Sequence, residues 1–265
     1  MTIDPLLATH DPSRYTVYQM LEYAAAFKHI KIIQQSLTNI FLCKTQPFVS
    51  GLYNQAQIVN QDFSQNDLAN IEEFFGKEIF RIKFSANKKI SELLMLAGYT
   101  FKDSWYIMIA DISPASEYLF SLPENVTIKK ANTLETINDY KLIFSEAFDR
   151  TLDQTNQNFD IFDSILLDPK DNHINTFVLY ENELPVSTWA YYAFDNFSIE
   201  NIGTRNAYRG KGYAYIIMQL LLQEAKKMWY TRACLVASEL WCPVYEKVWF
   251  HKVAKTNTFI PQVVG

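Results

Sequence analysis

The apolar positions in the N-terminal half of the chain switch between helical and strand spacing. Asp11 and Pro12 form a typical helix start, a side-chain cap followed by proline at the first helical position. Apolar residues recur at helical spacing from Val17 onwards, which predicts that this helix runs to about Gln35. The pattern then predicts strands at residues 38–45, 51–59, 79–84 and 105–112 and helices at residues 66–75 and 88–97.

A segment with little regular spacing follows, flanked by Pro114 and Pro123, and it favours a domain boundary. The two halves of the chain share a coarse order of elements, as in a tandem repeat of one fold. We therefore expect an α/β protein with a mixed sheet in two domains, residues 1–118 and 119–265. The second half is predicted to have strands at residues 126–130, 175–180, 186–194, 197–204, 233–238 and 256–260 and helices at residues 133–148, 159–167, 213–229 and 243–250.

Composition narrows the classes of function. A formal charge of −5 and the lack of a long basic block disfavour binding to nucleic acid, which depends on neutralising phosphates. No apolar run reaches the roughly 18 residues of a membrane-spanning helix, and the N-terminus lacks the layout of a signal peptide. The three cysteines have neither disulfide nor metal-ligand spacing. These features predict a cytoplasmic protein with no metal site, no membrane partner and no nucleic-acid partner.

Glycine is rare in the chain but gathers at one place. Three of the seven glycines, Gly203, Gly210 and Gly212, lie within ten residues, between an apolar strand and a long helix. Glycine can adopt a positive φ and lets a ligand approach the backbone, while the first amides of a helix carry a partial positive charge. Arg209 and Lys211 add side-chain charge beside them. The loop therefore predicts a binding site for an anionic group.

Two common nucleotide-binding loops do not fit this stretch. A Walker A loop has Ser or Thr after its lysine, whereas Gly212 follows Lys211. A Rossmann fingerprint needs a third glycine at the position that Tyr215 occupies. A nucleoside triphosphatase and a dehydrogenase are thus both poor interpretations of the loop.

The loop instead resembles the signature of the GNAT superfamily of N-acetyltransferases. Arg209, Gly212 and Ala214 match its pattern Arg/Gln-x-x-Gly-x-Gly/Ala. Downstream, residues 235–238 (Leu-Val-Ala-Ser) and 244–250 (Val-Tyr-Glu-Lys-Val-Trp-Phe) are similar to the family's next strand and helix. The resemblance extends over about residues 126–260 and implies the GNAT fold with acetyl-CoA as the cosubstrate. The first half resembles the degenerate GNAT-like half of two-domain members, and because it lacks the loop we expect it to bind no acetyl-CoA.

The resemblance also implies which residues contact acetyl-CoA. The backbone of the strand before the loop would pair with the pantetheine arm, and the loop amides would hold the pyrophosphate. Ser238 stands where the family has an asparagine, so its contact would be made by a shorter side chain. The implied cofactor-binding residues are Ile202, Gly203, Thr204, Arg209, Gly210, Lys211, Gly212, Tyr213, Ala214, Tyr215 and Ser238.

Two residues are candidates for acid–base chemistry. Tyr245 stands at the family's general-acid position, seven residues after Ser238, where a phenol could protonate the leaving thiolate; a core aromatic is the competing interpretation. Glu200 is the candidate base because it lies two residues before Ile202, and so on the same side of the strand. A salt-bridged or solvated strand residue is an equally open interpretation. Trp249 departs from the family, which has a glycine there that lets the helix end turn sharply.

The resemblance favours transfer of an acetyl group to a primary amine, by direct attack in a ternary complex. A non-catalytic acyl-CoA-binding or sensor protein with a GNAT fold is the alternative, and a longer acyl chain is also compatible with the loop. The acidic net charge favours a cationic amine as the acceptor. We expect a small molecule, but a small amine, an amino acid, a polyamine, an antibiotic and a protein amine are all open. The sequence does not distinguish between a monomer and a homodimer as the oligomeric state.

Overall fold

The computed structural model describes residues 9, 11–28, 30–46, 53–113, 121–159, 162–168 and 173–262. The chain forms two compact units. The first contains residues 1–108, 236–242 and 252–265, and the second contains residues 109–235 and 243–251. The domain boundary that we predict between residues 118 and 119 lies outside the described residues.

The first unit has a mixed sheet in the strand order β1-β2-β3-β4-β11-β5. The helix that begins at Pro12 ends at Lys28, so its predicted extension to about Gln35 is wrong. Residues 31–36 form a strand that pairs antiparallel with the next one, and this tertiary pairing overrides the apolar spacing. The elements are α2 (Pro12–Lys28), β1 (Lys31–Ser36), β2 (Ile40–Gln46), β3 (Gln55–Ile58), α3 (Gln65–Phe75), β4 (Arg81–Ser85), α4 (Lys88–Leu96), β5 (Tyr99–Asp111) and β11 (His251–Pro261).

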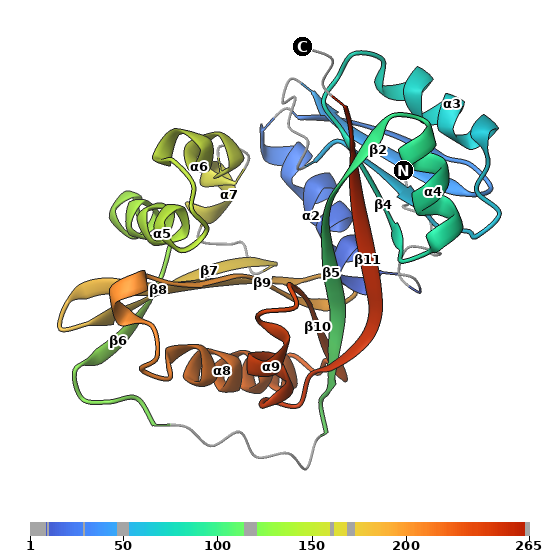
Figure 1. The fold of residues 1–265 in the computed structure, drawn as a ribbon. Coiled ribbons are helices and arrows are strands. Elements are labelled where there is room, and N and C mark those ends of the chain that lie inside the picture. The colour runs from blue at the N-terminus through green and yellow to red at the C-terminus, as the bar shows by residue number, and fades with distance from the viewer. Residues whose placement is uncertain are drawn as a thin grey trace. The chain divides into compact units, whose positions relative to one another are not determined.

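The core of the first unit lies between one face of this sheet and helices α3 and α4. Alternate strand residues such as Ile40 and Leu42 point to this face, where they meet Leu68 and Ile71 of α3. Phe75 and Phe80 stack with their ring centroids 4.4 Å apart at its edge. Helix α2 packs on the opposite face, so the sheet is covered on both sides (Figure 1).

The second unit has the strand order β10-β9-β8-β7-β6, with β10 parallel to β9 and the other pairs antiparallel. Helices α5, α6 and α7 cover one face of this sheet, and α8 and α9 lie on the other (Figure 1). The elements are β6 (Val126–Lys130), α5 (Leu134–Ala147), α6 (Leu152–Phe159), α7 (Asp163–Leu166), β7 (Ile174–Glu181), β8 (Leu184–Ala193), β9 (Phe197–Thr204), a 3₁₀ turn (Asn206–Tyr208), α8 (Tyr213–Lys227), β10 (Arg232–Ala237) and α9 (Cys242–Glu246).

A β-bulge interrupts β9. Glu200 pairs with Ala190 of β8 and Gly203 pairs with Thr188, so two residues of β9 lie opposite the single residue Trp189. The bulge contains Asn201, whose φ of 57° is in the left-handed region that asparagine tolerates better than most residues. Side chains before and after the bulge therefore do not follow simple alternation.

Candidate functional site

Strand β9 loses its pairing with β10 before it reaches the glycine-rich loop. In the described part of the chain, the register between β9 and β10 runs only from Phe197 to Ile199 on β9. Strand β9 itself continues to Thr204. Its last residues thus offer backbone N–H and C=O groups to a ligand that adds itself as a further strand. Two residues of this stretch, Ile202 and Thr204, were expected to bind the cofactor through their backbone.

The loop that follows β9 is shaped by two glycines with positive φ. Gly210 has φ 80° and Gly212 has φ 85°, and a Cβ atom added to either would meet no atom within 4 Å. Glycine is therefore required here by the backbone conformation, while the space beside the loop is open. Gly212 is the N-cap of α8, and no side chain caps this helix within the described residues. The first amides of α8, from Tyr213 to Tyr215, are left available to an anion.

The corresponding helix of the first unit is closed by its own side chains. Helix α3 also follows a strand, but Ser64 and Asp67 form a capping box at its N-terminus. The Asp67 carboxylate accepts hydrogen bonds from Ser64 N at 2.8 Å and from Asn39 Nδ2 at 3.0 Å. A carboxylate already lies at the positive end of α3, so this end is unsuited to a second anion.

Arg209 and Lys211 do not project freely from the loop. Arg209 Nε donates to the Thr204 carbonyl at 3.1 Å, and its Nη2 donates to the Ala147 carbonyl at 3.3 Å. Lys211 Nζ lies 2.8 Å from Glu181 Oε2 and 5.0 Å from the ring centroid of Tyr208. The arginine braces the loop against β9 and α5, and the lysine is paired with a carboxylate at the end of β7.

Two carboxylates hold the loop although nothing in the sequence pattern indicated them. Glu146 of α5 accepts from Arg205 Nε at 2.8 Å and from the Asn206 amide at 3.0 Å, and the hydrogen bond from Arg205 lowers its pKa. Hydrogen bonds from Lys211 and then Tyr213 lower the pKa of Glu181. Both residues lie far from the loop in sequence, so only the fold brings them there.

Gly203 serves packing between β9 and α5. A Cβ atom added at this position would lie 2.7 Å from the Ala147 Cβ and 3.1 Å from a ring carbon of Phe148. Only glycine lets the helix approach β9 so closely. The next residue, Thr204, is fixed by a hydroxyl contact of 2.8 Å with Ser187 of β8.

Glu200 lies on the α5 side of the sheet. Simple alternation placed Glu200 on the same face as Ile202. The bulge changes this, because the register puts Glu200 on the same face as Gly203 instead. The Ser198 hydroxyl donates to Glu200 Oε1 at 2.8 Å, which orients the carboxylate. Glu200 also lies near the hydroxyl of Tyr140, a buried residue of α5 whose pKa is raised first by burial. The assignment of Glu200 as a base stays a prediction.

The remaining predicted residues lie after β10. The Ser238 carbonyl accepts hydrogen bonds from Trp241 N at 3.0 Å and Cys242 N at 3.2 Å, which starts the turn into α9. Tyr245 is half-buried on α9, with its ring centroid 6.4 Å from that of Phe250. Trp249 has φ 69°, so it adopts the left-handed conformation for which the family uses glycine. The roles of Ser238 and Tyr245 stay predictions.

Two further observations concern the described residues alone. No group of three or more His, Cys, Asp and Glu side chains in them is placed to hold a metal ion. Within the same ranges, no helix is both long and apolar enough to cross a membrane.

Comparisons with known proteins identify the family of one segment and the fold of the chain. Residues 134–248 match the model of the Acetyltransferase (GNAT) family. A GCN5-related N-acetyltransferase from Kribbella flavida is similar in structure, with a TM-score of 0.69 and 15% identity over 96% of each chain. A GCN5-related N-acetyltransferase from Sphaerobacter thermophilus has a TM-score of 0.59 and 14% identity over 84% of this chain and 80% of its own.

A tandem GNAT protein from the clavulanic acid biosynthesis pathway is also similar, with a TM-score of 0.59 and 8% identity over 87% of this chain and 82% of its own. At such low sequence identities, these structures are similar to this chain in fold only. No protein with a curated description matches the sequence. Residues 134–248 thus form a domain of the GNAT acetyltransferase family, in a chain that has the fold of a tandem GNAT protein.

Proposed function

We propose that the chain is an acetyl-CoA-dependent N-acetyltransferase that acetylates a primary amine on a small molecule. The observation that carries this proposal is the start of α8, which Gly212 opens at φ 85° without a side-chain cap. Such a helix start suits a pyrophosphate, and the unpaired end of β9 suits the amide-bearing pantetheine arm. Membership of residues 134–248 in the GNAT family supports acetyl-CoA as the donor.

The proposed contacts follow from this arrangement. The backbone of Ile202 and Thr204 would pair with the pantetheine arm, and the amides of residues 210–215 would hold the pyrophosphate. Arg209 would act by fixing the loop, since its donors are used by the carbonyls of Thr204 and Ala147. Ser238 is proposed as a further polar contact to the cosubstrate.

The proposed reaction is a direct transfer. The amine nitrogen forms a bond to the acetyl carbonyl carbon while the carbon–sulfur bond breaks. The amine loses one proton and the departing thiolate gains one. We assign the first proton to Glu200, through a water molecule, and the second to the hydroxyl of Tyr245. Holding the amine and the thioester in line supplies much of the rate.

Ligand-induced thermal shifts test the central claim. The melting temperature of the chain is measured with acetyl-CoA, CoA and ATP, and we expect both CoA forms to raise it more than ATP does. If neither CoA form raises it, the proposal is wrong. An amine panel assayed by free-thiol release follows, with acetyl-CoA in excess.

The same experiment decides the alternative function. A chain that is stabilised by CoA but releases no thiol with any amine is an acyl-CoA-binding protein with a GNAT fold. Release of thiol with longer acyl-CoA donors, but little with acetyl-CoA, would identify a different acyl group.

A further inference from the structure

The last turn of α5 is hydrogen-bonded to the segment between β9 and α8. Glu146 Oε2 accepts from Arg205 Nε at 2.8 Å, and Glu146 Oε1 accepts from the Asn206 amide at 3.0 Å. The neighbouring Ala147 carbonyl accepts from Arg209 Nη2 at 3.3 Å. All of these residues belong to the second unit. The end of α5 therefore holds the segment that leads into the glycine-rich loop.

The Glu146 carboxylate also caps the 3₁₀ turn in this segment. Arg205 precedes the turn but does not cap it with its own side chain. The first amide of the turn, that of Asn206, donates instead to Glu146 on another helix. The backbone hydrogen bonds of the turn continue as far as Arg209, the residue before Gly210. A change at the start of the turn is therefore passed on to the loop amides.

The ion pair between Arg205 and Glu146 is partly exposed. Their side chains are 29% and 33% exposed. Ion pairs of this kind contribute little to the stability of a protein, because solvent screens the attraction. A carboxylate that accepts from two donors at once still fixes their geometry. The hydrogen bond from Arg205 lowers the pKa of Glu146, which favours this ionised form.

A carboxylate beside a loop that would bind an anion needs a reason, since its charge repels the ligand. Glu181 has the same charge, but it accepts from the side chains of Lys211 and Tyr213. Glu146 also accepts from a backbone amide of the turn before the loop. The two carboxylates should therefore affect binding differently, Glu181 through charge and Glu146 through the conformation of the backbone.

We propose that Glu146 is a positioning residue for the cosubstrate, which it would not touch itself. By holding Arg205 and the Asn206 amide against α5, it fixes the turn before Gly210 and with it the amides of residues 210–215. A loop that is already in its binding conformation loses less conformational entropy when the ligand binds. This inference rests on the proposed binding of the CoA pyrophosphate by these amides.

The variant Glu146→Gln tests the inference with little change in side-chain shape. Glutamine has one acceptor oxygen, and its NH₂ group would face the second of the two donors. We expect the dissociation constant for CoA, measured by titration calorimetry, to rise about tenfold, as when one hydrogen bond to a charged group is lost. Charge alone predicts the opposite, because the variant removes a negative charge from beside the loop. The sign of the change therefore separates positioning from charge.

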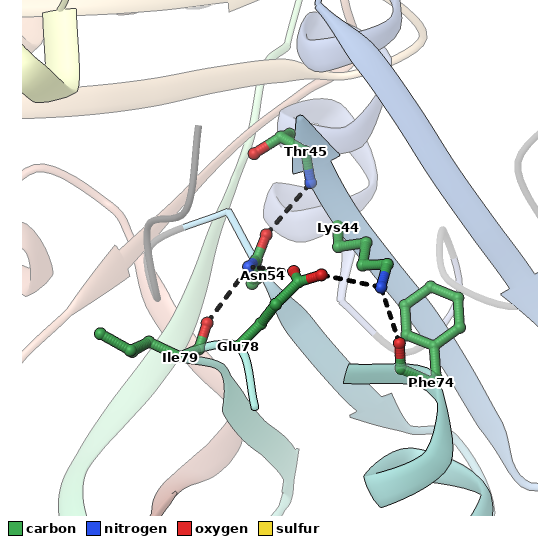
Figure 2. Close-up of polar contacts among 6 residues, drawn as sticks. All are labelled: Lys44, Thr45, Asn54, Phe74, Glu78 and Ile79. Atoms are coloured by element: carbon green, nitrogen blue, oxygen red, sulfur yellow. Dashed lines mark hydrogen bonds and ion pairs between the residues drawn. The ribbon is translucent and has the colours of Figure 1, made fainter. Parts of the chain in front are cut away.

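Glu78→Gln is the matched control in the first unit. Glu78 also accepts from a cation and from an amide group, with Oε1 2.9 Å from Lys44 Nζ and Oε2 3.2 Å from Asn54 Nδ2 (Figure 2). The control substitution changes the net charge by the same amount and breaks the same kind of contact. We expect it to leave the dissociation constant for CoA unchanged.

Hydrogen exchange of the ligand-free chain reports on the loop directly. Peptides that cover residues 205–215 should exchange faster in Glu146→Gln than in the wild type, because the turn is released from α5. Peptides of α3, in the first unit, should exchange at the same rate in both. This measurement does not depend on CoA, so it detects a change in the loop separately from a change in affinity.

The outcomes distinguish failure of this inference from failure of the proposed function. If the wild type binds no CoA, the proposed function is wrong, and the positioning role is wrong with it. If the wild type binds CoA and Glu146→Gln binds it as tightly or more tightly, only the positioning role is wrong. An equal loss of affinity in Glu78→Gln, or a loss in Glu146→Gln without faster exchange of the loop, would also overturn it.

Discussion

Lys211 Nζ lies 2.8 Å from Glu181 Oε2, so the lysine of the proposed pyrophosphate loop is already paired with a carboxylate. A bound phosphate would compete with Glu181 for this lysine. The hydrogen bond from Lys211 lowers the pKa of Glu181, which favours the ionised carboxylate beside the lysine. If CoA binds as proposed, we expect this arrangement to limit its affinity.

The variant Glu181→Gln should therefore tighten CoA binding, because Lys211 is released to the phosphates. The gain should be largest at low ionic strength and shrink as salt is added, since the loop is exposed to solvent. Calorimetric titration with CoA at two salt concentrations measures it. Glu183→Gln is the matched control, because it removes the same charge from the same turn but its partner is Lys129. Equal changes in both variants would show that net charge, not the release of Lys211, causes the effect.

Gly212→Ala should weaken CoA binding at least tenfold. Alanine at φ 85° costs about 1–2 kcal/mol, and the loop can lower this cost only by moving its amides. Thermal shift with CoA measures the loss. Gly98→Ala is the control, because Gly98 has the same φ of 85° and equally open surroundings but lies in the first unit. Both variants should lose similar stability without ligand, and only Gly212→Ala should lose the response to CoA.

Gly203→Ala should destabilise the second unit. The added methyl group would lie 2.7 Å from the Ala147 Cβ, so α5 must move away from β9. Overpacking of this kind costs about 1–3 kcal/mol. Urea unfolding of the variant and wild type gives the difference. A free energy of unfolding equal to that of the wild type would show that α5 can move away from β9 at no cost.

Tyr245→Phe tests the proposed general acid. It keeps the ring against Phe250 and removes the phenol, so turnover should fall by about 10²-fold or more while CoA binding is retained. Thiol release and CoA titration measure the two effects. Tyr180→Phe serves as the control, because it removes a hydroxyl that bonds Asp139 at 2.7 Å in the same unit. If turnover falls equally in both variants, Tyr245 has only a packing role.

Lys83 should make stability depend on pH on the alkaline side. Its folded-state pKa is lowered, so between that pKa and the value of about 10.4 in the unfolded chain, the unfolded state binds more protons. Stability should therefore rise with pH across this window. Lys83→Met should be more stable than wild type at neutral pH, and the difference should shrink as the pH approaches 10. Urea unfolding from pH 7 to pH 10 checks this; a constant difference would contradict it.

The chain's local signals predicted most of the elements and the glycine-rich loop. Caps, strand ends and helix starts depend mainly on neighbouring residues, so local sequence patterns predict them well. Examples are the cap at Asp11, the strand that ends at Thr204 and the helix that follows Gly212. The family resemblance was confirmed by the match over residues 134–248. What it implies about single residues of the site is still prediction.

The rest depended on contacts between distant segments. Residues 31–36 form a strand because β2 pairs with them, although their apolar spacing extends that of the preceding helix. Glu146 and Glu181 reach the loop only through the fold, so no local pattern could indicate them. The left-handed Asn201 changed the face on which Glu200 lies, and a single asparagine within a strand gives no clear sign of a bulge.

The position of β11 bears on how the protein is made. This strand pairs with β4 of the first unit, yet it is synthesised after almost all of the second unit. While the ribosome translates the intervening residues, β4 has an exposed hydrogen-bonding edge of the kind that promotes aggregation. The N-terminal unit can reach its final structure only when translation of β11 is complete. Deletion of residues 251–262 should therefore unfold the first unit, to which β11 belongs in the fold. The second unit, which precedes β11 in the sequence, should be affected less.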